Sequence, residues 1–353
     1  MGKEKDGKKG KSICLAVCLL LAGILTGCGA AGEKTEGAME LIGSLNYQDA
    51  LGELDAAEEN GENLRLINRA RGIAYMGLTE YEQAIEAFKA SLAGSNGIIQ
   101  NIDFDLNYYL AAAYTKNGQY LEAKETYDAI LALRGNQADA YFLRGNAKMW
   151  LSDYEGAKND FDRALALEPK NYDRLIQLYQ VLEHFGRGEE GKTYLETALA
   201  SGDKQMDQYV TGRIYYYLGE YQKAYLALEE AKEKGGAESY LYLGRAYEAT
   251  GDYNYAANVY NSWLAKNEGN PEMYNQLGLC ELNRGEYQKA LEAFQAGKQL
   301  GGGGMMQSLS FNEVVAYERL GDFEQARALL GTYLNNYPDD ANAKREFEFL
   351  STR

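Results

Sequence analysis

An aromatic residue followed three positions later by a small residue recurs about every 34 residues through most of this chain. The aromatic positions are Tyr47, Tyr81, Tyr120, Tyr154, Tyr221, Tyr253, Tyr287 and Phe323, with Gly188 in the slot between Tyr154 and Tyr221. The matching small residues are Ala50, Ala84, Ala123, Ala157, Gly191, Ala224, Ala256, Ala290 and Ala326. A period of this length is typical of a chain that stacks one supersecondary unit many times.

Residues 237–270 show the unit most clearly, because their spacing predicts two amphipathic helices joined by a turn. The first helix places these residues on one face: Tyr240, Leu243, Gly244 and Tyr247. The second helix does the same with Tyr253, Ala256, Tyr260 and Trp263. Gly251 is expected to take the left-handed conformation that ends the first helix, and Asp252 to cap the second. Small Gly244 and Ala256 would let the helices approach closely, with rings such as Tyr247 and Tyr260 in the core.

The pattern aromatic-x-x-Leu-Gly-x-x-Tyr, followed by Ala-x-x-x-aromatic at a period of 34, resembles the tetratricopeptide repeat. The resemblance covers nearly all of the chain from about Ala31 onward. It implies an all-α, right-handed α-solenoid of about nine helix-turn-helix repeats over residues 38–340, with a capping helix at 341–353. Repeat five, residues 172–204, departs from the pattern, since Gly188 replaces the aromatic and Tyr179 a small residue. A five-residue insertion, residues 99–103, lengthens the connection between repeats two and three.

The N-terminus carries a targeting signal. Five lysines within residues 1–11 precede an apolar run, residues 12–25, that is short for a membrane-spanning helix. The run ends in Leu25-Thr26-Gly27-Cys28, which resembles the bacterial lipobox. This resemblance implies a signal peptide over residues 1–27, lipidation of Cys28, a short tether over residues 28–37, and anchoring on the extracytoplasmic side of a bacterial cell membrane. The alternative is an ordinary cleaved signal in which Cys28 has no role.

Charge limits the partners of the exported chain. Residues 1–27 hold five of the 36 Lys and Arg and two of the 52 Asp and Glu, so the remainder has a net charge of −19. Such a surface should not bind nucleic acid or anionic lipid through charge, and should favour neutral or basic protein partners.

Catalytic chemistry is not expected. His184 is the only histidine, and the four cysteines form no CxxC pair, so neither a metal site nor a cofactor is predicted. A nucleophilic triad would have to use His184 within a repeat helix. Cys280, in the first helix of a repeat, is interpreted as a small core residue.

Binding residues are carried over from the family resemblance. With each repeat numbered 1–34 and the second-helix aromatic at position 17, first-helix positions 2, 5, 6, 9, 12 and 13 face the concave groove in the family. This assigns the groove to Tyr108, Tyr109, Phe142, Asn146, Trp150, His184, Tyr209, Arg213, Tyr216, Tyr217, Tyr242 and Arg245. Aromatic and arginine side chains are the types that dominate recognition surfaces. The alternative for each residue is packing against an adjacent repeat.

The sequence therefore favours a protein-binding scaffold in the bacterial cell envelope. Two other functions stay open. Tyr and Trp side chains in a groove also stack on sugars, which would suit a glycan-binding surface lipoprotein. An assembly factor for pili, secretion or envelope biogenesis would be a special case of the scaffold.

Overall fold

The structure is a computed structural model that describes residues 32–204, 206–267, 269–301, 303–338 and 340–352. The predicted signal peptide and the predicted lipidation site Cys28 lie outside the described residues. The chain divides into two compact units, residues 1–160 and 161–353, and the boundary falls within helix α8. Every regular element in the described residues is helical, which confirms the predicted all-α class.

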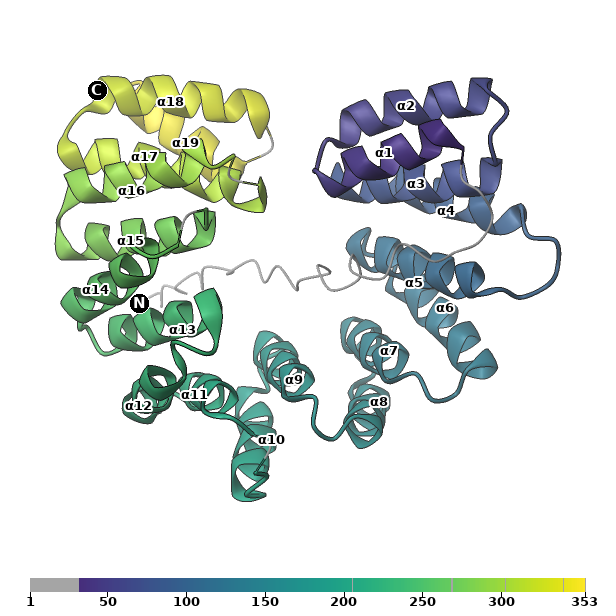
Figure 1. Cartoon of the computed structure of the whole chain (residues 1–353), viewed down its shortest axis with the longest axis horizontal. Helices are drawn as coiled ribbons and strands as arrows, with labels where there is room; N and C mark the ends of the chain where they lie inside the picture. The colour runs from purple at the N-terminus through teal and green to yellow at the C-terminus, as the bar shows by residue number, and fades with distance from the viewer. Residues whose placement is uncertain (1–31, 205, 268, 302, 339, 353) are drawn as a thin grey trace, which may run out of the picture. The chain divides into compact units, whose positions relative to one another are not determined.

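Helices follow one another as antiparallel hairpins (Figure 1). Up to the boundary helix they are α1 (Glu33–Gly43), α2 (Tyr47–Glu59), α3 (Leu64–Gly77), α4 (Tyr81–Ala93), α5 (Asn101–Lys116), α6 (Tyr120–Leu133), α7 (Ala138–Trp150) and α8 (Tyr154–Leu167). The second unit continues with α9 (Tyr172–His184), α10 (Gly188–Ala200), α11 (Gln208–Tyr217), α12 (Tyr221–Ala231), α13 (Gly236–Ala249) and α14 (Tyr253–Leu264). It ends with α15 (Pro271–Arg284), α16 (Tyr287–Gln299), a 3-10 turn η2 (Gly303–Met305), α17 (Met306–Leu320), α18 (Phe323–Asn336) and α19 (Ala341–Leu350).

The recurring aromatic residue marks the start of the second helix in every repeat except the fifth, where α10 begins at Gly188. Tyr47, Tyr81, Tyr253 and Phe323 are each the first residue of their helix, as the 34-residue period predicts. Gly251 has φ 82°, which confirms the left-handed turn before α14. The capping prediction for Asp252 was wrong, because its side chain makes no cap hydrogen bond and instead accepts one from the Thr250 hydroxyl at 3.2 Å.

Within a hairpin, a small residue in the first helix faces a large one in the second. Gly244 lies so close to Tyr260 that a Cβ added there would come within 2.2 Å of the ring, so only glycine fits. Repeat five reverses the sizes: Tyr179 is buried in α9, and Gly191 of α10 makes room for its ring. The departure seen in the sequence is therefore compensated within the same hairpin, and the stack continues through it.

One core prediction needs correction. Tyr260 is fully buried as expected, but Tyr247 is only half-buried. Its ring lies in a stack between Tyr225 at 4.8 Å and Tyr255 at 5.5 Å, and Tyr255 is exposed. Tyr247 thus packs at the edge of the core of the second unit and is not enclosed by it.

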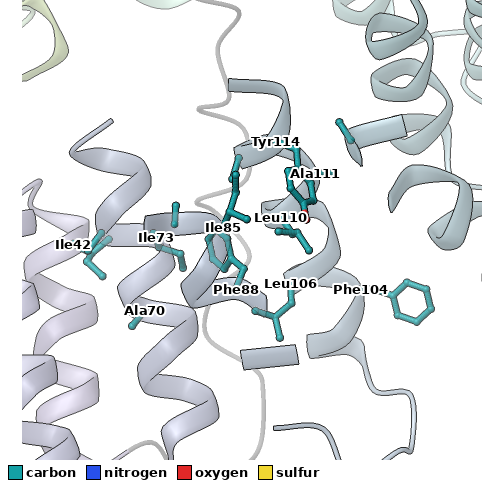
Figure 2. Close-up of a cluster of buried hydrophobic side chains, with 14 of the residues drawn as sticks. Ile42, Ala70, Ile73, Ile85, Phe88, Phe104, Leu106, Leu110, Ala111 and Tyr114 are labelled. Atoms are coloured by element: carbon teal, nitrogen blue, oxygen red, sulfur yellow. The ribbon is translucent and has the colours of Figure 1, made fainter. Parts of the chain in front are cut away.

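The buried residues of the first unit form a continuous strip from α1 to α7, as stacked repeats require. Figure 2 shows part of this strip, where Phe88, Leu106 and Leu110 bring α4 and α5 together. At the other end of the chain, α19 places Ala343 and Leu350 against buried residues of α17 and α18. This confirms the predicted capping helix, which Asp340 starts by accepting hydrogen bonds from the backbone of Asn342 and Ala343.

Cys280 is a core residue, as the sequence predicts. Its side chain is fully buried in α15, and burial raises the pKa of its thiol to about 12. The thiol donates to the carbonyl oxygen of Tyr253 at 3.2 Å, so it is held as a neutral group that is inert as a nucleophile.

Candidate functional site

The predicted groove residues of the first unit contact separate neighbours. Tyr109 of α5 stacks on Phe88 with the ring centroids 5.5 Å apart, and the guanidinium of Arg69 lies 5.6 Å from the Tyr109 ring. Tyr108, the next residue along the helix, packs instead against Tyr127 at 6.3 Å. Both tyrosines are half-buried against the core of the first unit, and each packs on a different ring.

Helix α7 carries the other three candidates of the first unit. Phe142 is buried, with 4% of its surface exposed, so its assignment to the groove was wrong. It belongs to the apolar packing between hairpins, because position 5 of this helix turns inward. Asn146 is half-buried, and Trp150 at the end of α7 is 43% exposed, stacked on Tyr120 with the ring centroids 4.9 Å apart.

In the second unit, six of the predicted residues meet in one place, which we call the tyrosine–arginine cluster. They are Tyr209, Arg213, Tyr216 and Tyr217 of α11 with Tyr242 and Arg245 of α13. These first helices contact one another directly, and α11 also contacts α9. The Tyr242 ring lies 6.4, 5.6 and 6.1 Å from the rings of Tyr209, Tyr216 and Tyr217, respectively, so it is the centre of the cluster. All six side chains are half-buried.

Arg213 is the charged group inside the cluster. Its guanidinium lies 5.1 Å from the Tyr209 ring and 5.2 Å from the Tyr242 ring, so two aromatic neighbours hold the cation. Only 12% of its side chain is exposed, and one nitrogen pairs with Asp173 of α9. Its Nε is buried and has no hydrogen-bond partner among the described residues. Arg245 lies on the other side, 5.7 Å from the Tyr242 ring, and pairs with Glu272 of α15 at 2.8 Å.

A line of hydrogen bonds joins three first helices at the cluster. The side-chain amide of Gln180 in α9 donates to the Tyr217 hydroxyl at 2.7 Å, and the Tyr217 and Tyr242 hydroxyl oxygens are 3.0 Å apart. The Tyr209 hydroxyl donates to Glu238 of α13. These bonds fix the ring orientations before any partner arrives, which lowers the entropic cost of binding.

Burial and the neighbouring polar and charged groups shift the pKa values of the side chains in the cluster. Burial, and then the neighbouring Tyr242 hydroxyl, raise the pKa of Tyr217, and burial likewise raises the pKa of Tyr209 and Tyr216. Burial opposes the charge on Arg213, but the oxygens of Tyr242 and Asp173 outweigh it and raise its pKa. At neutral pH the cluster therefore presents neutral hydroxyl groups around a permanent cation.

His184 lies apart from the cluster. It is exposed at the end of α9, and its ring meets the edge of Phe185 at 5.1 Å. Across the described residues, no three His, Cys, Asp or Glu side chains are grouped so that they could hold a metal ion. Nor does any helix described here combine the length and apolar character needed to cross a membrane.

Family comparison accounts for the repeated hairpins. Matches to the tetratricopeptide repeat cover residues 69–138, 138–171, 209–271, 241–304 and 311–340, which together make up more than half of the chain. The chain belongs to the tetratricopeptide repeat family. No catalytic family is indicated for this repeat scaffold.

Individual relatives of this tetratricopeptide repeat protein are distant. RNA polymerase II-associated protein 3 of Xenopus tropicalis is 24% identical over 231 residues, covering 64% of this chain and 32% of that protein. The chain spans about a third or less of the length of the curated relatives it matches. Yeast Tom70 has a TM-score of 0.52 at 13% identity, covering 90% of this chain and 87% of Tom70, which shows the shared fold. A tetratricopeptide repeat protein from Parabacteroides merdae has a TM-score of 0.44 at 16% identity, covering 73% and 98%.

Repeat positions also explain which site residues the sequence interpretation missed. The partners of the cluster are Asp173, Gln180, Glu238 and Glu272. Asp173, Glu238 and Glu272 occupy position 2 of repeats five, seven and eight, and Gln180 occupies position 9 of repeat five. These positions were among the groove positions considered, so a signal existed. It was overlooked because the predicted set contained no carboxylate, whereas the structure pairs Arg213 and Arg245 each with a position-2 carboxylate.

Proposed function

We propose that this tetratricopeptide repeat protein is a scaffold that holds a segment of a partner protein against the tyrosine–arginine cluster. The supporting observation is Arg213, which is 12% exposed between two rings and keeps a buried Nε without a hydrogen-bond partner among the described residues. Buried donors without partners cost free energy, so proteins retain them rarely outside functional sites. A partner carbonyl or carboxylate at this point would remove that cost.

The surrounding carboxylates limit what the partner segment can be. Asp173 is 64% and Glu272 45% exposed, and both remain accessible beside the arginines they pair with. A segment that approaches the cluster therefore meets four half-buried tyrosine rings with acidic groups around them. Neutral or basic side chains suit this rim, since aromatic faces attract cations and flat apolar groups equally well.

The proposal also includes a lipid anchor at the N-terminus. The Leu25-Thr26-Gly27-Cys28 sequence supports a lipidated Cys28 and a site of action on the extracytoplasmic face of a bacterial cell membrane. Helix α1 begins at Glu33, so only a few residues would separate the lipid from the first repeat. A scaffold attached in this way would bring its partner close to the membrane surface.

A photo-crosslinking experiment tests the cluster. A benzoylphenylalanine residue placed at Tyr216 in the full chain should crosslink a membrane-associated protein in cells, and the same crosslinker at exposed Tyr255 serves as the matched control. Arg213→Gln should weaken the capture from Tyr216 by at least tenfold and leave the Tyr255 background unchanged. Equal crosslinking from both positions, unaffected by Arg213→Gln, would contradict the proposal.

Two further measurements test the lipid anchor and the choice between a protein partner and a glycan. Cys28→Ala should abolish acyl labelling and leave unprocessed precursor; labelled protein of mature mass would exclude the lipobox. Raising the salt concentration should weaken the capture of a basic partner, because exposed charges are screened over about 8 Å at physiological ionic strength. Salt-independent binding of an oligosaccharide that competes with the partner would instead support a glycan-binding protein.

A further inference from the structure

A second site lies in the first unit, where the connection between α4 and α5 is longer than the four-residue links that join α2 to α3 and α6 to α7. This connection, residues 94–100, passes over a cavity of about 240 Å³. Its apolar lining comes from both helical hairpins around it: Leu92, Ile99, Phe104, Ala129, Ile130 and Leu133. The insertion predicted at residues 99–103 has therefore opened a hollow between neighbouring repeats.

Phe104 shows how the hollow forms. Figure 2 shows its ring apart from Phe88, Leu106 and Leu110, which turn toward the core of the first unit. The ring is 9% exposed, so it is covered from another direction. That cover is Arg134, whose guanidinium lies 3.5 Å from the centroid of the Phe104 ring.

The mouth of the cavity is apolar and open. The lining residues Ile99 and Leu133 are 57% and 58% exposed, although they are large aliphatic residues, and Ile98, which precedes Ile99, is 67% exposed. The connection itself, from Ala93 to Ile102, contains no charged residue. Exposed aliphatic groups around a hollow of this kind release water when an apolar side chain enters.

One positive charge at the edge of the cavity is not neutralised. Arg134 donates to the amide oxygen of Asn101 at 2.8 Å, and no carboxylate of the described residues pairs with it. The nearby lining residue Asp103 is already bound by Arg65, and both of those side chains are largely buried. Arg134 therefore keeps a charge that no described carboxylate pairs with, although the chain as a whole is acidic.

We propose that this cavity binds one large apolar side chain of a partner polypeptide, with an adjacent carboxylate of the same segment on Arg134. The volume is below the roughly 300–1,000 Å³ of typical small-molecule pockets, so it suits a single side chain. The uncompensated guanidinium selects an acidic neighbour, because arginine binds carboxylates with directed hydrogen bonds. This site is independent of the tyrosine–arginine cluster and favours the opposite partner charge.

The test uses two synthetic nine-residue peptides and the full chain. Each peptide carries photo-leucine at its centre, flanked on both sides by glutamate in the probe and by glutamine in its control. The glutamate peptide should crosslink to lining residues of the cavity, within residues 92–104 and 129–133. The glutamine peptide should give at least fivefold less product at the same concentration.

Variants at exposed positions make the result specific. Arg134→Gln should reduce labelling by the glutamate peptide to the level of the glutamine peptide. Leu133→Asp should abolish labelling by both peptides, while Leu226→Asp, a matched change at a 68% exposed leucine of α12, should not alter it. Both aspartate variants should melt at the temperature of the parent, since both leucines are exposed.

Three outcomes would overturn the proposal. Labelling that is equal for the two peptides, or unchanged in Arg134→Gln, would remove the role of the carboxylate. Labelling that persists in Leu133→Asp would place the peptide outside the cavity. Self-association of the parent chain, measured by sedimentation and abolished in Leu133→Asp, would assign the cavity to a second copy of this chain. None of these results depends on the cluster around Arg213, so the two proposals fail separately.

Discussion

The two units each contain an arginine that is mostly buried, and the two arginines are satisfied in opposite ways. In the first unit, Arg144 donates from all three guanidinium nitrogens to carboxylates, at 2.6–2.8 Å to Asp160 and at 2.6 Å to Asp128. In the second unit, Arg213 has one carboxylate partner, two aromatic rings and a buried Nε that no described residue accepts from. Removing one partner of a fully paired buried charge leaves the other partner uncompensated and destabilises the fold. A buried donor that is left unsatisfied can instead donate to a partner's oxygen without losing a bond of the fold.

The aromatic side chains of the two units also differ in how they are packed. In the first unit, Tyr108, Tyr109 and Trp150 each pack against a different aromatic neighbour, and Phe142 is in the core. In the second unit, four tyrosine rings lie around one another, and hydrogen bonds from Gln180 to Tyr217 and between Tyr217 and Tyr242 connect three helices. Identical repeat positions therefore serve packing in one unit and form a candidate site in the other. The variants below test this contrast, from the largest expected effect to the smallest.

Phe142→Ala should have the largest effect. Deletion of a buried phenylalanine ring costs about 3–5 kcal/mol, so the free energy of unfolding should fall by that amount, measured by urea denaturation. Trp150→Ala in the same helix is the control, and its 43% exposure predicts a loss of roughly 1 kcal/mol. Equal losses for the two variants would mean that Phe142 is not a core residue.

Arg144→Met and Arg213→Met should separate stability from binding. Arg144→Met leaves the buried Asp160 carboxylate with Lys148 as its one remaining ion-pair partner. Breaking a buried ion pair costs about 3–5 kcal/mol of unfolding free energy. Partner capture should stay unchanged at temperatures where Arg144→Met is folded.

The second variant should behave in the opposite way. Arg213→Met leaves Asp173, which is 64% exposed and can be solvated, so we expect roughly 1 kcal/mol of destabilisation. Binding of the crosslinked partner should weaken by roughly 2 kcal/mol, as for a central arginine of an interface. If both variants lose stability and binding alike, the distinction between the two arginines is wrong.

Tyr217→Phe should have a smaller effect, because it removes only the hydroxyl that links α9 to α13. The free energy of unfolding should fall by about 1 kcal/mol, the typical net contribution of one hydrogen bond. A double-mutant cycle with Gln180→Leu should give a coupling energy of similar size. Tyr109→Phe is the matched change in the first unit and should stay within about 0.5 kcal/mol of the parent, since no described residue bonds to its hydroxyl.

The smallest effect concerns pH and lies at the C-terminal cap. Burial, and then the Glu346 carboxylate of α19, raise the pKa of Glu318 from 4.5 to about 7, with Arg319 opposing the shift. The protonated acid is therefore favoured in the folded state, so its stabilising contribution is complete below pH 4.5 and is lost as the pH rises toward 7.

Thermal melts between pH 4.5 and 7 should show that the protein becomes less stable as the pH rises, because Glu318 loses its proton. Discounted for partial exposure, the effect should be about 1 kcal/mol. Glu318→Gln should flatten the decrease, and a profile identical to that of the parent would exclude Glu318 as its source. Glu238→Gln, within the cluster, is a control that should leave this pH dependence in place.

The sequence by itself determined the hairpins and their order. The aromatic residue at the start of each second helix, the glycine opposite a ring and the terminal cap all follow from local spacing, because they are satisfied within one repeat or its nearest neighbour. Even the irregular fifth repeat was visible as Gly188 and Tyr179. The family resemblance also selected the six residues that the structure brings together in the tyrosine–arginine cluster, and their role in binding stays a prediction.

Only the tertiary structure decided which of these residues act together. Position 5 is buried at Phe142 but lies beside an arginine at Tyr209, because the degree of exposure depends on how neighbouring first helices pack. The pairing of Arg213 with Asp173 and of Arg245 with Glu272 joins different repeats, at a distance in sequence that local periodicity does not encode. The cavity beside Arg134 also depends on tertiary packing. An insertion is visible in the sequence, but the space beneath it exists only once α4, α5 and α6 have packed.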